Sequence, residues 1–265
     1  MGFEHRRAKI ERWLSPSDPS TNYNKALLQR HEGSGTWFLQ GDAFAKWKTA
    51  RNSFLWLYGI LGCGKTILSS TIIENLETTP SLRPVVYFYF DFKDTTKQTL
   101  ESMVRSLISQ LFSKSEQTWQ SLFSLFSSHD DGRRQPTLEL LSQVLLQMIE
   151  QVKEVWIILD ALDECSTKGG PSKGLLSWMR ELLNSEKRNV HLLATSRREQ
   201  DIEYRVKEFA HKDDMIQIQS SVVTDDIRVY IRTRLRQDEG FWRWRNLPDV
   251  QQEIETRLME KADGM

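Results

Sequence analysis

Short apolar runs alternate with longer amphipathic segments over the first 220 residues of the chain. Apolar runs of four to six residues are too short for helices of their own and predict buried strands. Strands that alternate with helices predict an α/β fold whose parallel sheet is covered on both faces. The five predicted strands are Phe54–Tyr58, Val85–Phe90, Val155–Leu159, Val190–Thr195 and Met215–Ile218.

Between these runs, apolar residues recur three and four positions apart, as expected for helices with one buried face. The clearest stripe begins at Leu100 and continues through Met103, Val104, Leu107, Ile108 and Leu111. The other predicted helices in this part of the chain are Glu4–Leu14, Asn24–Arg30, Phe44–Trp47, Ile67–Leu76, Leu138–Val152 and Leu175–Leu183.

After Ser220 the pattern is helical only. Thr224 is the expected N-cap of the first helix there, because a hydroxyl at that position can accept a bond from the first turn. Apolar residues on one face of this helix are Ile227, Tyr230, Ile231 and Leu235. A last helix is predicted over Pro248–Ala262.

The first predicted strand leads directly into the sequence Gly-Ile-Leu-Gly-Cys-Gly-Lys-Thr at Gly59–Thr66, which matches the P-loop pattern. Glycines let backbone N–H groups turn inward, and the following helix adds partial positive charge at its N-terminus. We expect Lys65 to reach the β- and γ-phosphates and the Thr66 hydroxyl to bind Mg²⁺. The predicted nucleotide-binding residues are Gly59, Gly62, Cys63, Gly64, Lys65, Thr66 and Ile67.

Acidic residues follow the third predicted strand. Asp160 stands at its carboxyl end, where a P-loop enzyme needs its Walker B acid for Mg²⁺. Asp163 and Glu164 offer a carboxylate that could polarise an attacking water. An acidic turn that merely ends a strand is the simpler alternative, but its position downstream of a P-loop favours the catalytic interpretation.

The fourth predicted strand ends in Thr-Ser-Arg-Arg. In a P-loop fold with an extra strand, this tip lies near the γ-phosphate, where a cation can stabilise the terminal phosphate. We predict this role for Arg197, and expect Arg198 to face solvent or to pair with Glu199.

Composition narrows the class of protein. The chain has 36 basic and 36 acidic residues, so no net charge favours nucleic acid or a membrane surface as partner. No run approaches the ~18 apolar residues of a membrane span. The two cysteines, Cys63 and Cys165, indicate a reducing compartment, and we expect a cytoplasmic protein. The segment Phe241–Arg245 interleaves aromatic and basic residues, as some nucleic-acid-binding surfaces do, but we interpret it as a hinge between helices or as a patch that would meet further domains.

Three motifs carry a family resemblance: the P-loop, Leu-Asp-Ala-Leu-Asp-Glu-Cys at Leu159–Cys165, and Ala-Thr-Ser-Arg at Ala194–Arg197. Together they resemble the NACHT branch of the STAND signal-transduction NTPases, above all fungal NLR-like proteins whose P-loop domain is described as nephrocystin-like. The segments similar to the lead-in of those proteins are Trp13–Pro16, Asn22–Lys25 and Gly35–Leu39.

The resemblance implies a three-layer α/β/α core with strand order 5-1-4-3-2, a closed state with ADP and an open, self-assembling state with ATP. It assigns the Walker A pair to Lys65 and Thr66, the Mg²⁺ acid to Asp160, the following acidic pair to Asp163 and Glu164, and the sensor arginine to Arg197.

Two further positions are singled out by the resemblance. Ala161 stands where many family members have glycine. The segment before the first strand packs near adenine in relatives, which makes Gly35, Thr36 and Trp37 candidates for the edge of a base pocket.

The expected domain organisation has three parts: a helical lead-in (1–50), the P-loop NTPase core (51–220) and the start of a helical lid (221–265). The resemblance also implies a winged helix, a repeat array and an effector domain. None is recognisable in this sequence, so we expect a fragment or a truncated product.

The leading functional hypothesis is a regulated switch that binds Mg²⁺ with ATP or ADP, hydrolyses ATP slowly and self-assembles when activated. A nucleotide-dependent interaction module that scarcely hydrolyses is the main alternative, and a small-molecule kinase is a weaker one. ATP is favoured over GTP, because the near match to a guanine-reading motif at Glu260–Asp263 begins with the wrong residue and falls in a helix.

Overall fold

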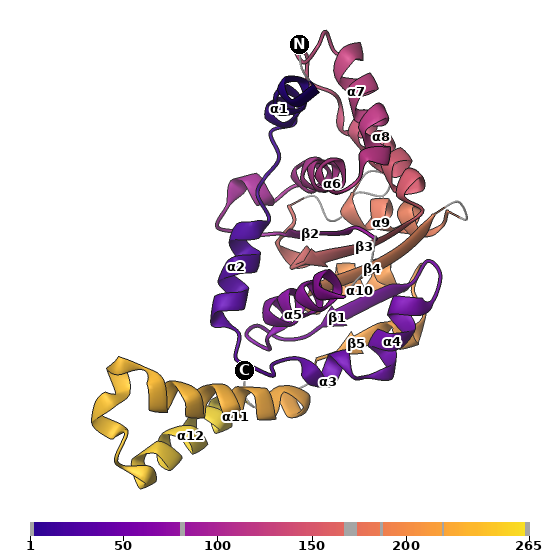
Figure 1. The fold of residues 1–265 in the computed structure, drawn as a ribbon. Coiled ribbons are helices and arrows are strands. Elements are labelled where there is room, and N and C mark those ends of the chain that lie inside the picture. Colours follow the sequence, from indigo (N-terminus) through magenta and orange to yellow (C-terminus); the bar gives the residue numbers. More distant parts are fainter. Residues whose placement is uncertain (1–2, 80–82, 167–173, 186–187, 219, 263–265) are drawn as a thin grey trace.

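A single parallel sheet forms the centre of the computed structural model, which describes residues 3–79, 83–166, 174–185, 188–218 and 220–262 (Figure 1). The strand order is β2-β3-β4-β1-β5, and each neighbouring pair is parallel. Counted from the other edge, this is the predicted order 5-1-4-3-2, which is therefore confirmed. The strands are β1 (Phe54–Tyr58), β2 (Val85–Tyr89), β3 (Glu154–Asp160), β4 (Asn189–Ser196) and β5 (Met215–Gln217).

The predicted strands differ from the observed ones at their ends. β3 and β4 are longer than their apolar runs because the ladder continues into polar residues, with Glu154 paired to Asn189. β2 and β5 are each one residue shorter than predicted, and Phe90 follows β2 with its N–H bonded to the Asp160 carbonyl at 3.0 Å. Strand ends are thus set by partner strands as well as by hydrophobicity.

Alternating side chains of the strands supply two separate cores, one on each face of the sheet. On β2, Val86 and Phe88 belong to one core, whereas Tyr87 and Tyr89 belong to the other. The first core packs under α1 (Phe3–Leu14), α6 (Leu100–Lys114), α7 (Trp119–Ser128), α8 (Leu138–Val152), α9 (Leu175–Leu183) and α10 (Gln200–Val206). The second packs under α2 (Ser20–Gln29), α3 (Thr36–Leu39), α4 (Asp42–Thr49) and α5 (Lys65–Thr78).

Short 3-10 turns join several of these elements. They are η1 (Thr95–Lys97), η2 (Glu116–Thr118), η3 (Leu162–Glu164), η4 (Lys212–Asp214) and η5 (Glu239–Trp244). The predicted helices are all present, α2 beginning four residues before its predicted start, while α3, α7 and α10 were not predicted from the sequence.

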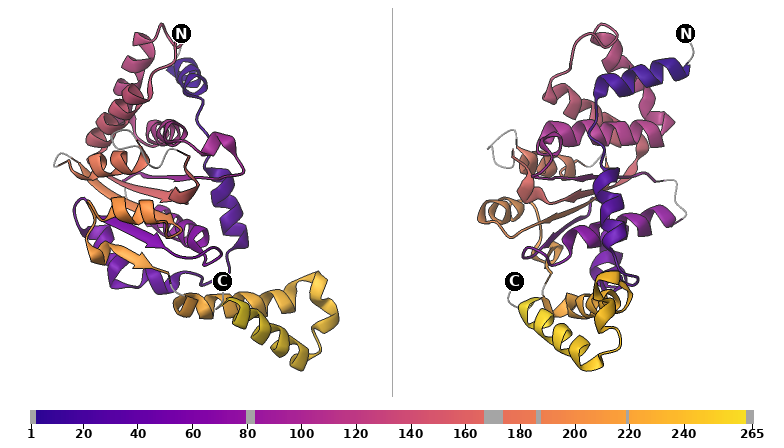
Figure 2. Two further views of the ribbon diagram at one scale, coloured as in Figure 1. Left: turned by 180° about the vertical axis from the view of Figure 1, so that it is seen from behind. Right: turned by 90° about the vertical axis from the view of Figure 1, so that its left-hand side faces the viewer.

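The last two helices, α11 (Ser220–Gln237) and α12 (Pro248–Ala262), form a hairpin that projects beyond the β5 edge of the sheet (Figures 1 and 2). Ile231 and Leu235 of α11 are buried, as the apolar stripe predicted. The predicted N-cap at Thr224 is wrong, because α11 begins at Ser220 and Thr224 lies inside it. Threonine tolerates such a position by turning its hydroxyl back to a carbonyl of the preceding turn, so residue type alone does not mark a helix start. Within the described residues, no helix has both the length and the apolar character that crossing a bilayer requires.

Candidate functional site

The P-loop joins β1 to α5 at the carboxyl edge of the sheet. Gly62 and Gly64 have φ of +79° and +85°, the left-handed region that side chains other than glycine rarely adopt. Gly59 is required for a different reason, because a Cβ there would lie 2.6 Å from the Cys63 Sγ and 3.0 Å from the Ile218 carbonyl. The glycine spacing of the motif thus follows from two left-handed turns and one close approach.

Lys65 is the first residue of α5, and its ammonium group lies against the loop. Nζ donates to the carbonyl oxygens of Gly59 at 2.9 Å and Ile60 at 2.7 Å, and lies 3.5 Å from the Cys63 Sγ. The positive charge therefore sits at the N-terminus of α5, where backbone N–H groups also attract anions. Contact of Lys65 with a phosphate stays a prediction.

Asp160 ends β3 and is 2% exposed. The Thr66 hydroxyl donates to its Oδ2 at 2.8 Å, and the Ser69 and Thr195 hydroxyls donate to its Oδ1 at 2.6 and 2.7 Å. Burial raises the pKa of Asp160 despite these three hydrogen bonds and the nearby Lys65, all of which favour the charged form. The two residues predicted to hold Mg²⁺, Thr66 and Asp160, are thus in direct contact.

The contacts of Ser69 and Thr195 with Asp160 were not predicted from the sequence. Ser69 lies three residues after Thr66 on α5, so both hydroxyls share one helix face. Thr195 follows Ala194, which pairs with Leu159 in the register of β3 and β4. Helix spacing could have predicted the position of Ser69 beside Thr66, whereas the position of Thr195 beside Asp160 depends on the register of β3 and β4.

Ala161, which follows Asp160, has φ of +59°. Its N–H donates to the Thr195 Oγ1 at 3.1 Å, and its carbonyl accepts from the Glu164 N–H at 2.9 Å. A left-handed alanine is a strained residue, which gives the physical reason why glycine suits this position.

Asp163 and Arg197 form an ion pair between η3 and the end of β4. The Arg197 backbone N–H donates to the Asp163 Oδ1 at 2.9 Å, and its Nε donates to Oδ2 at 2.6 Å. The Asp163 side chain is 3% exposed, whereas the Arg197 side chain is 48% exposed. Both oxygens of Asp163 therefore accept hydrogen bonds from Arg197. Arg197 is the residue predicted from the sequence to lie near the γ-phosphate.

Arg198 faces solvent, which was one of the two alternatives predicted for it. It bonds both carboxylate oxygens of Glu203, at 2.8 and 3.1 Å, and is exposed. Because Glu203 lies on α10, a helix not predicted from the sequence, this partner could not be anticipated.

Glu164 lies beside Asp163 but has a different environment. Its Oε2 accepts the Phe92 N–H at 2.9 Å from the segment after β2. Burial raises the pKa of Glu164, and the charges of Asp163, Asp91 and Asp160 raise it further against the Phe92 hydrogen bond. A carboxylate with a raised pKa is a better proton acceptor near neutral pH than an exposed one.

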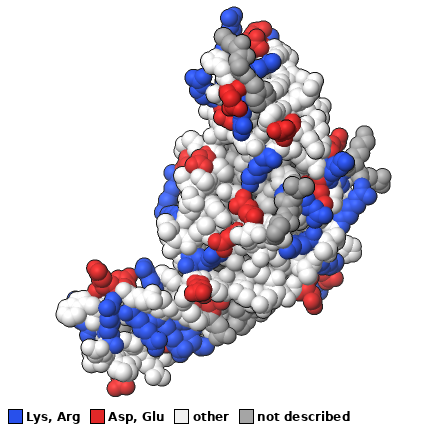
Figure 3. Space-filling model, viewed as in Figure 1, with Lys and Arg blue, Asp and Glu red and all other residues white. Residues whose placement is uncertain are grey.

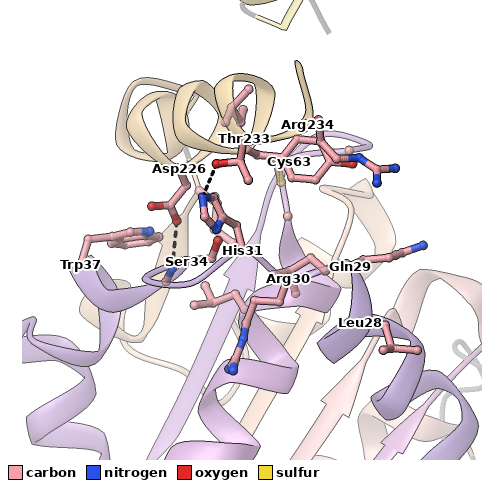
Figure 4. A pocket seen from close by; sticks show the side chains of 18 of the residues that line it. Leu28, Gln29, Arg30, His31, Ser34, Trp37, Cys63, Asp226, Thr233 and Arg234 are labelled. Atoms are coloured by element: carbon pink, nitrogen blue, oxygen red, sulfur yellow. Dashed lines mark hydrogen bonds between the residues drawn. The ribbon is translucent and has the colours of Figure 1, made fainter. Parts of the chain in front are cut away.

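A cavity of about 670 Å³ opens next to the P-loop (Figure 4). Its walls come from the α2–α3 connection, the P-loop with the start of α5, and α11. Gly62, Cys63, Gly64 and Ile67 line it, as do Gly35 and Trp37 of the predicted base-pocket edge. Thr36 does not line it, and its hydroxyl instead donates to the Gly33 carbonyl at 2.6 Å.

Two hydrogen bonds join α11 to the lead-in across this cavity, both drawn in Figure 4. The Gly35 N–H donates to the Asp226 Oδ2 at 2.8 Å, and the Thr233 Oγ1 lies 2.8 Å from the His31 Nε2. These pairs could not be predicted from local sequence patterns, because their members lie about 200 positions apart.

The oxygen atoms of Thr66 and Asp160 suit Mg²⁺, a hard cation that prefers oxygen ligands. In the described part of the chain, no group of three or more His, Cys, Asp or Glu could hold a metal ion. Mg²⁺ in nucleotide sites is commonly bound by one or two protein groups plus phosphates and water. The donor set therefore fits a metal that binds together with a nucleotide.

The aromatic and basic segment at Phe241–Arg245 lies at the tip of the α11–α12 hairpin. Phe241 stacks on Trp244, and the Arg243 guanidinium lies over the same ring. Arginines also gather along the hairpin (Figure 3), where Arg228 and Arg232 both pair with Glu255. The segment connects two helices, in agreement with the hinge interpretation.

No curated protein matches the chain. The Walker-type ATPase PABY2304 of Pyrococcus abyssi is similar in structure, with a TM-score of 0.50 and 15% identity, over 87% of this chain and 64% of that one. The chain thus spans less than two thirds of that protein, and the likeness shows the fold alone. The cytoplasmic domain of the type VII secretion ATPase EccC of Thermomonospora curvata matches with a TM-score of 0.29 and 16% identity, over 60% of this chain and 20% of that one.

The family described as "Nephrocystin 3, N-terminal" matches residues 33–197. This range begins in the segment before α3 and ends at Arg197, so it includes the P-loop, the Walker B strand and the tip of β4. Since the match covers more than half of the chain, the protein belongs to the nephrocystin 3 N-terminal family and is a P-loop NTPase by fold.

Proposed function

We propose that this chain is a nucleotide switch of the NACHT/STAND type that binds Mg²⁺ with ATP or ADP and hydrolyses ATP slowly. The contact between Thr66 and Asp160, at 2.8 Å and directly beside the P-loop, is the observation that carries the proposal. The Walker-type ATPase with the same fold supports an ATPase activity, and the three motifs in order support the family branch.

The P-loop residues bind and orient the nucleotide. Backbone N–H groups of Gly62–Thr66 and the N-terminus of α5 receive the phosphates, and Lys65 exchanges its bonds to the loop carbonyls for phosphate oxygens. The Thr66 hydroxyl and the Asp160 carboxylate hold Mg²⁺, which supplies neutralisation of phosphate charge. The base lies in the adjoining cavity against the lead-in and α11.

Asp163 and Glu164 take different roles in this proposal. Asp163 positions Arg197, because both its oxygens are bound to that residue, and Arg197 stabilises the terminal phosphate. Glu164 accepts the proton of the attacking water, for which its raised pKa suits it.

A second candidate function, a module that binds nucleotide but scarcely hydrolyses it, is favoured by one observation. Both acids after the Walker B strand already accept hydrogen bonds from the protein, Asp163 from Arg197 and Glu164 from Phe92. If these bonds persist with nucleotide bound, both oxygens of Asp163 stay engaged with Arg197, and one oxygen of Glu164 stays engaged with Phe92. Single-turnover hydrolysis separates the two functions.

In this proposal the α11–α12 hairpin is the part that moves. It lines the cavity through α11 and otherwise projects from the core (Figure 2). We propose the division into lead-in, core and start of lid given above, with nucleotide controlling lid angle and self-assembly. The two cysteines are free thiols, which supports a cytoplasmic location.

Titration calorimetry with ATP and ADP, with Mg²⁺ or with EDTA, tests the proposal. Wild-type protein is expected to bind both nucleotides and to bind ATP more weakly in EDTA. Lys65→Ala should lose binding by at least about ten-fold, since it removes a charged contact. Lys48→Ala is the matched control, because Lys48 lies on α4 and faces the Phe44 ring. Absence of ATP binding by folded wild-type protein would refute the proposal.

A further inference from the structure

We propose that Asp226, on α11, determines base specificity by selecting a purine nucleotide whose base carries a 6-amino group. This inference rests on the proposed function, since it assumes that the base of a bound nucleotide enters the cavity beside the P-loop. It assigns to one lid side chain the discrimination of ATP from 6-keto purine nucleotides.

Asp226 lines the cavity and is the only carboxylate among the described residues that do so. The other charged side chains of its walls are those of Arg30 and Arg234, and each is paired with an acid, Glu74 at 2.6 Å and Asp238 at 3.2 Å. Asp226 therefore contributes the acidic character of the cavity wall.

The carboxylate is held in a fixed position by the lead-in. Its Oδ2 accepts the Gly35 N–H at 2.8 Å. Gly35 has φ of +78°, and a Cβ there would lie 2.9 Å from the Leu68 Cδ1, so the loop packs closely on α5. Asp226 is thus anchored to a loop that itself rests on the helix following the P-loop.

The other oxygen of Asp226, Oδ1, accepts no hydrogen bond from the described part of the chain. A carboxylate oxygen can accept but not donate a hydrogen bond. The 6-amino group of adenine offers a donor to such an atom, whereas the 6-keto oxygen of hypoxanthine or guanine offers a second acceptor and is repelled. Guanine has two neighbouring donors that suit a bidentate carboxylate, but one oxygen of Asp226 is already bound to Gly35.

A second contact between α11 and the lead-in allows an effect on base specificity to be distinguished from an effect of loosening α11. The Thr233–His31 hydrogen bond joins α11 to the lead-in two turns further along the helix. Thr233→Val removes this bond without changing the charge of the cavity. A variant at Thr233 is therefore a matched control for any effect that comes from loosening the lid.

The test compares ATP with inosine triphosphate, whose base carries a keto oxygen in place of the 6-amino group and an N1–H donor in place of the N1 acceptor. Affinities are measured by calorimetry for wild type, Asp226→Asn and Thr233→Val. Asparagine keeps an oxygen for the Gly35 N–H and presents an amide donor to the base. Wild type is expected to prefer ATP by at least about ten-fold, and Asp226→Asn to lose or reverse this preference. Thr233→Val should keep the preference even if both affinities fall.

Equal affinities of wild type for the two triphosphates, or an unchanged ATP preference in Asp226→Asn, would overturn the assignment of Asp226 while leaving the proposed function intact. If neither triphosphate binds to folded wild type, and Lys65→Ala behaves identically, the proposed function fails and the inference fails with it. Circular dichroism confirms that each variant is folded before its affinities are compared.

Discussion

Asp163 holds Arg197 at two points, accepting its backbone N–H at 2.9 Å and its side-chain Nε at 2.6 Å. A two-point contact fixes both the end of β4 and the direction in which the guanidinium leaves the sheet. Because Asp163 is buried and Arg197 is half exposed, the pair has an anchored acid and a cation that can still meet a ligand. Asp163 thus uses both carboxylate oxygens to position Arg197.

Asp163→Ala is predicted to slow ATP turnover by about 10- to 100-fold while ATP affinity changes less, because Arg197 loses its orientation but the P-loop is untouched. Stopped assays under saturating ATP measure turnover, and calorimetry measures affinity. Arg198→Ala is the control, since Arg198 is exposed and pairs with Glu203. Equal turnover in Asp163→Ala and wild type would show that Arg197 needs no such support.

Glu164 should make turnover depend on pH. Burial raises the pKa of this carboxyl, and as a base it acts only after losing its proton. Turnover is therefore expected to rise with pH through a midpoint above that of an ordinary glutamate. Glu164→Gln should abolish this rise together with most of the turnover, whereas Asp201→Asn, an exposed acid on α10, should change neither. A pH profile of Glu164→Gln that matches wild type would assign the base elsewhere.

Asp160→Asn is predicted to stabilise the fold in the absence of nucleotide. Burial raises the pKa of Asp160 above its unfolded value, so its contribution to stability is complete below the unfolded pKa and is lost as pH rises through the folded pKa. At pH 7 the charged form therefore costs stability. We therefore expect Asp160→Asn to raise the free energy of unfolding at pH 7.

Asparagine can keep all three hydroxyl contacts of Asp160, because its oxygen accepts from Ser69 and Thr195 and its amide can donate to the Thr66 hydroxyl. Urea unfolding in EDTA at pH 7 and at pH 5 measures the gain, which should shrink at the lower pH. The same variant should lose the Mg²⁺ dependence of ATP binding. Lower stability of Asp160→Asn at pH 7 would contradict this account.

The parts of the fold that were predictable depend on short stretches of sequence. β1 and the P-loop glycines follow one another within Phe54–Gly64, and local hydrophobicity and turn chemistry are sufficient to define them. The helix that follows begins at Lys65, two residues before its predicted start. The strand order came instead from the family resemblance. At Ala161 the structure agrees with the family resemblance, since its φ of +59° explains why relatives favour glycine there.

The parts of the site that were not predictable depend on distant segments. Thr195 reaches Asp160 through the register of β3 and β4, and Asp226 meets Gly35 only because α11 crosses the lead-in. Thr195 lies in the Ala-Thr-Ser-Arg motif, but the motif does not show that it contacts Asp160, and no motif marks Asp226. Similarly, threonine is common at helix N-termini, but the start of α11 at Ser220 is not determined by residue preference at Thr224.

His191, on β4, is fully buried with polar partners. Its Nδ1 lies 2.8 Å from the Ser53 Oγ, and its Nε2 lies 3.0 Å from the Glu154 Oε1. These residues stand at the amino ends of the strands, opposite the P-loop. His191→Leu is expected to lower the free energy of unfolding by about 1–3 kcal/mol, since buried polar groups lose a partner. ATP affinity below the melting transition should be unchanged, and a lower affinity would link this end of the sheet to the site.

Two P-loop glycines should respond differently to alanine. A Cβ at Gly59 would lie 2.6 Å from the Cys63 Sγ, whereas one at Gly62 would meet no atom within 4 Å and would suffer only from its φ of +79°. Gly62→Ala is thus expected to cost about 1–2 kcal/mol of stability from backbone strain. Gly59→Ala should displace the Cys63 side chain, and the double variant Gly59→Ala/Cys63→Ala should recover part of the lost stability and ATP affinity. Thermal unfolding and calorimetry of the three variants measure both effects. A double variant no better than Gly59→Ala would place the limiting contact at the Ile218 carbonyl, 3.0 Å away, which cannot be relieved by a smaller side chain.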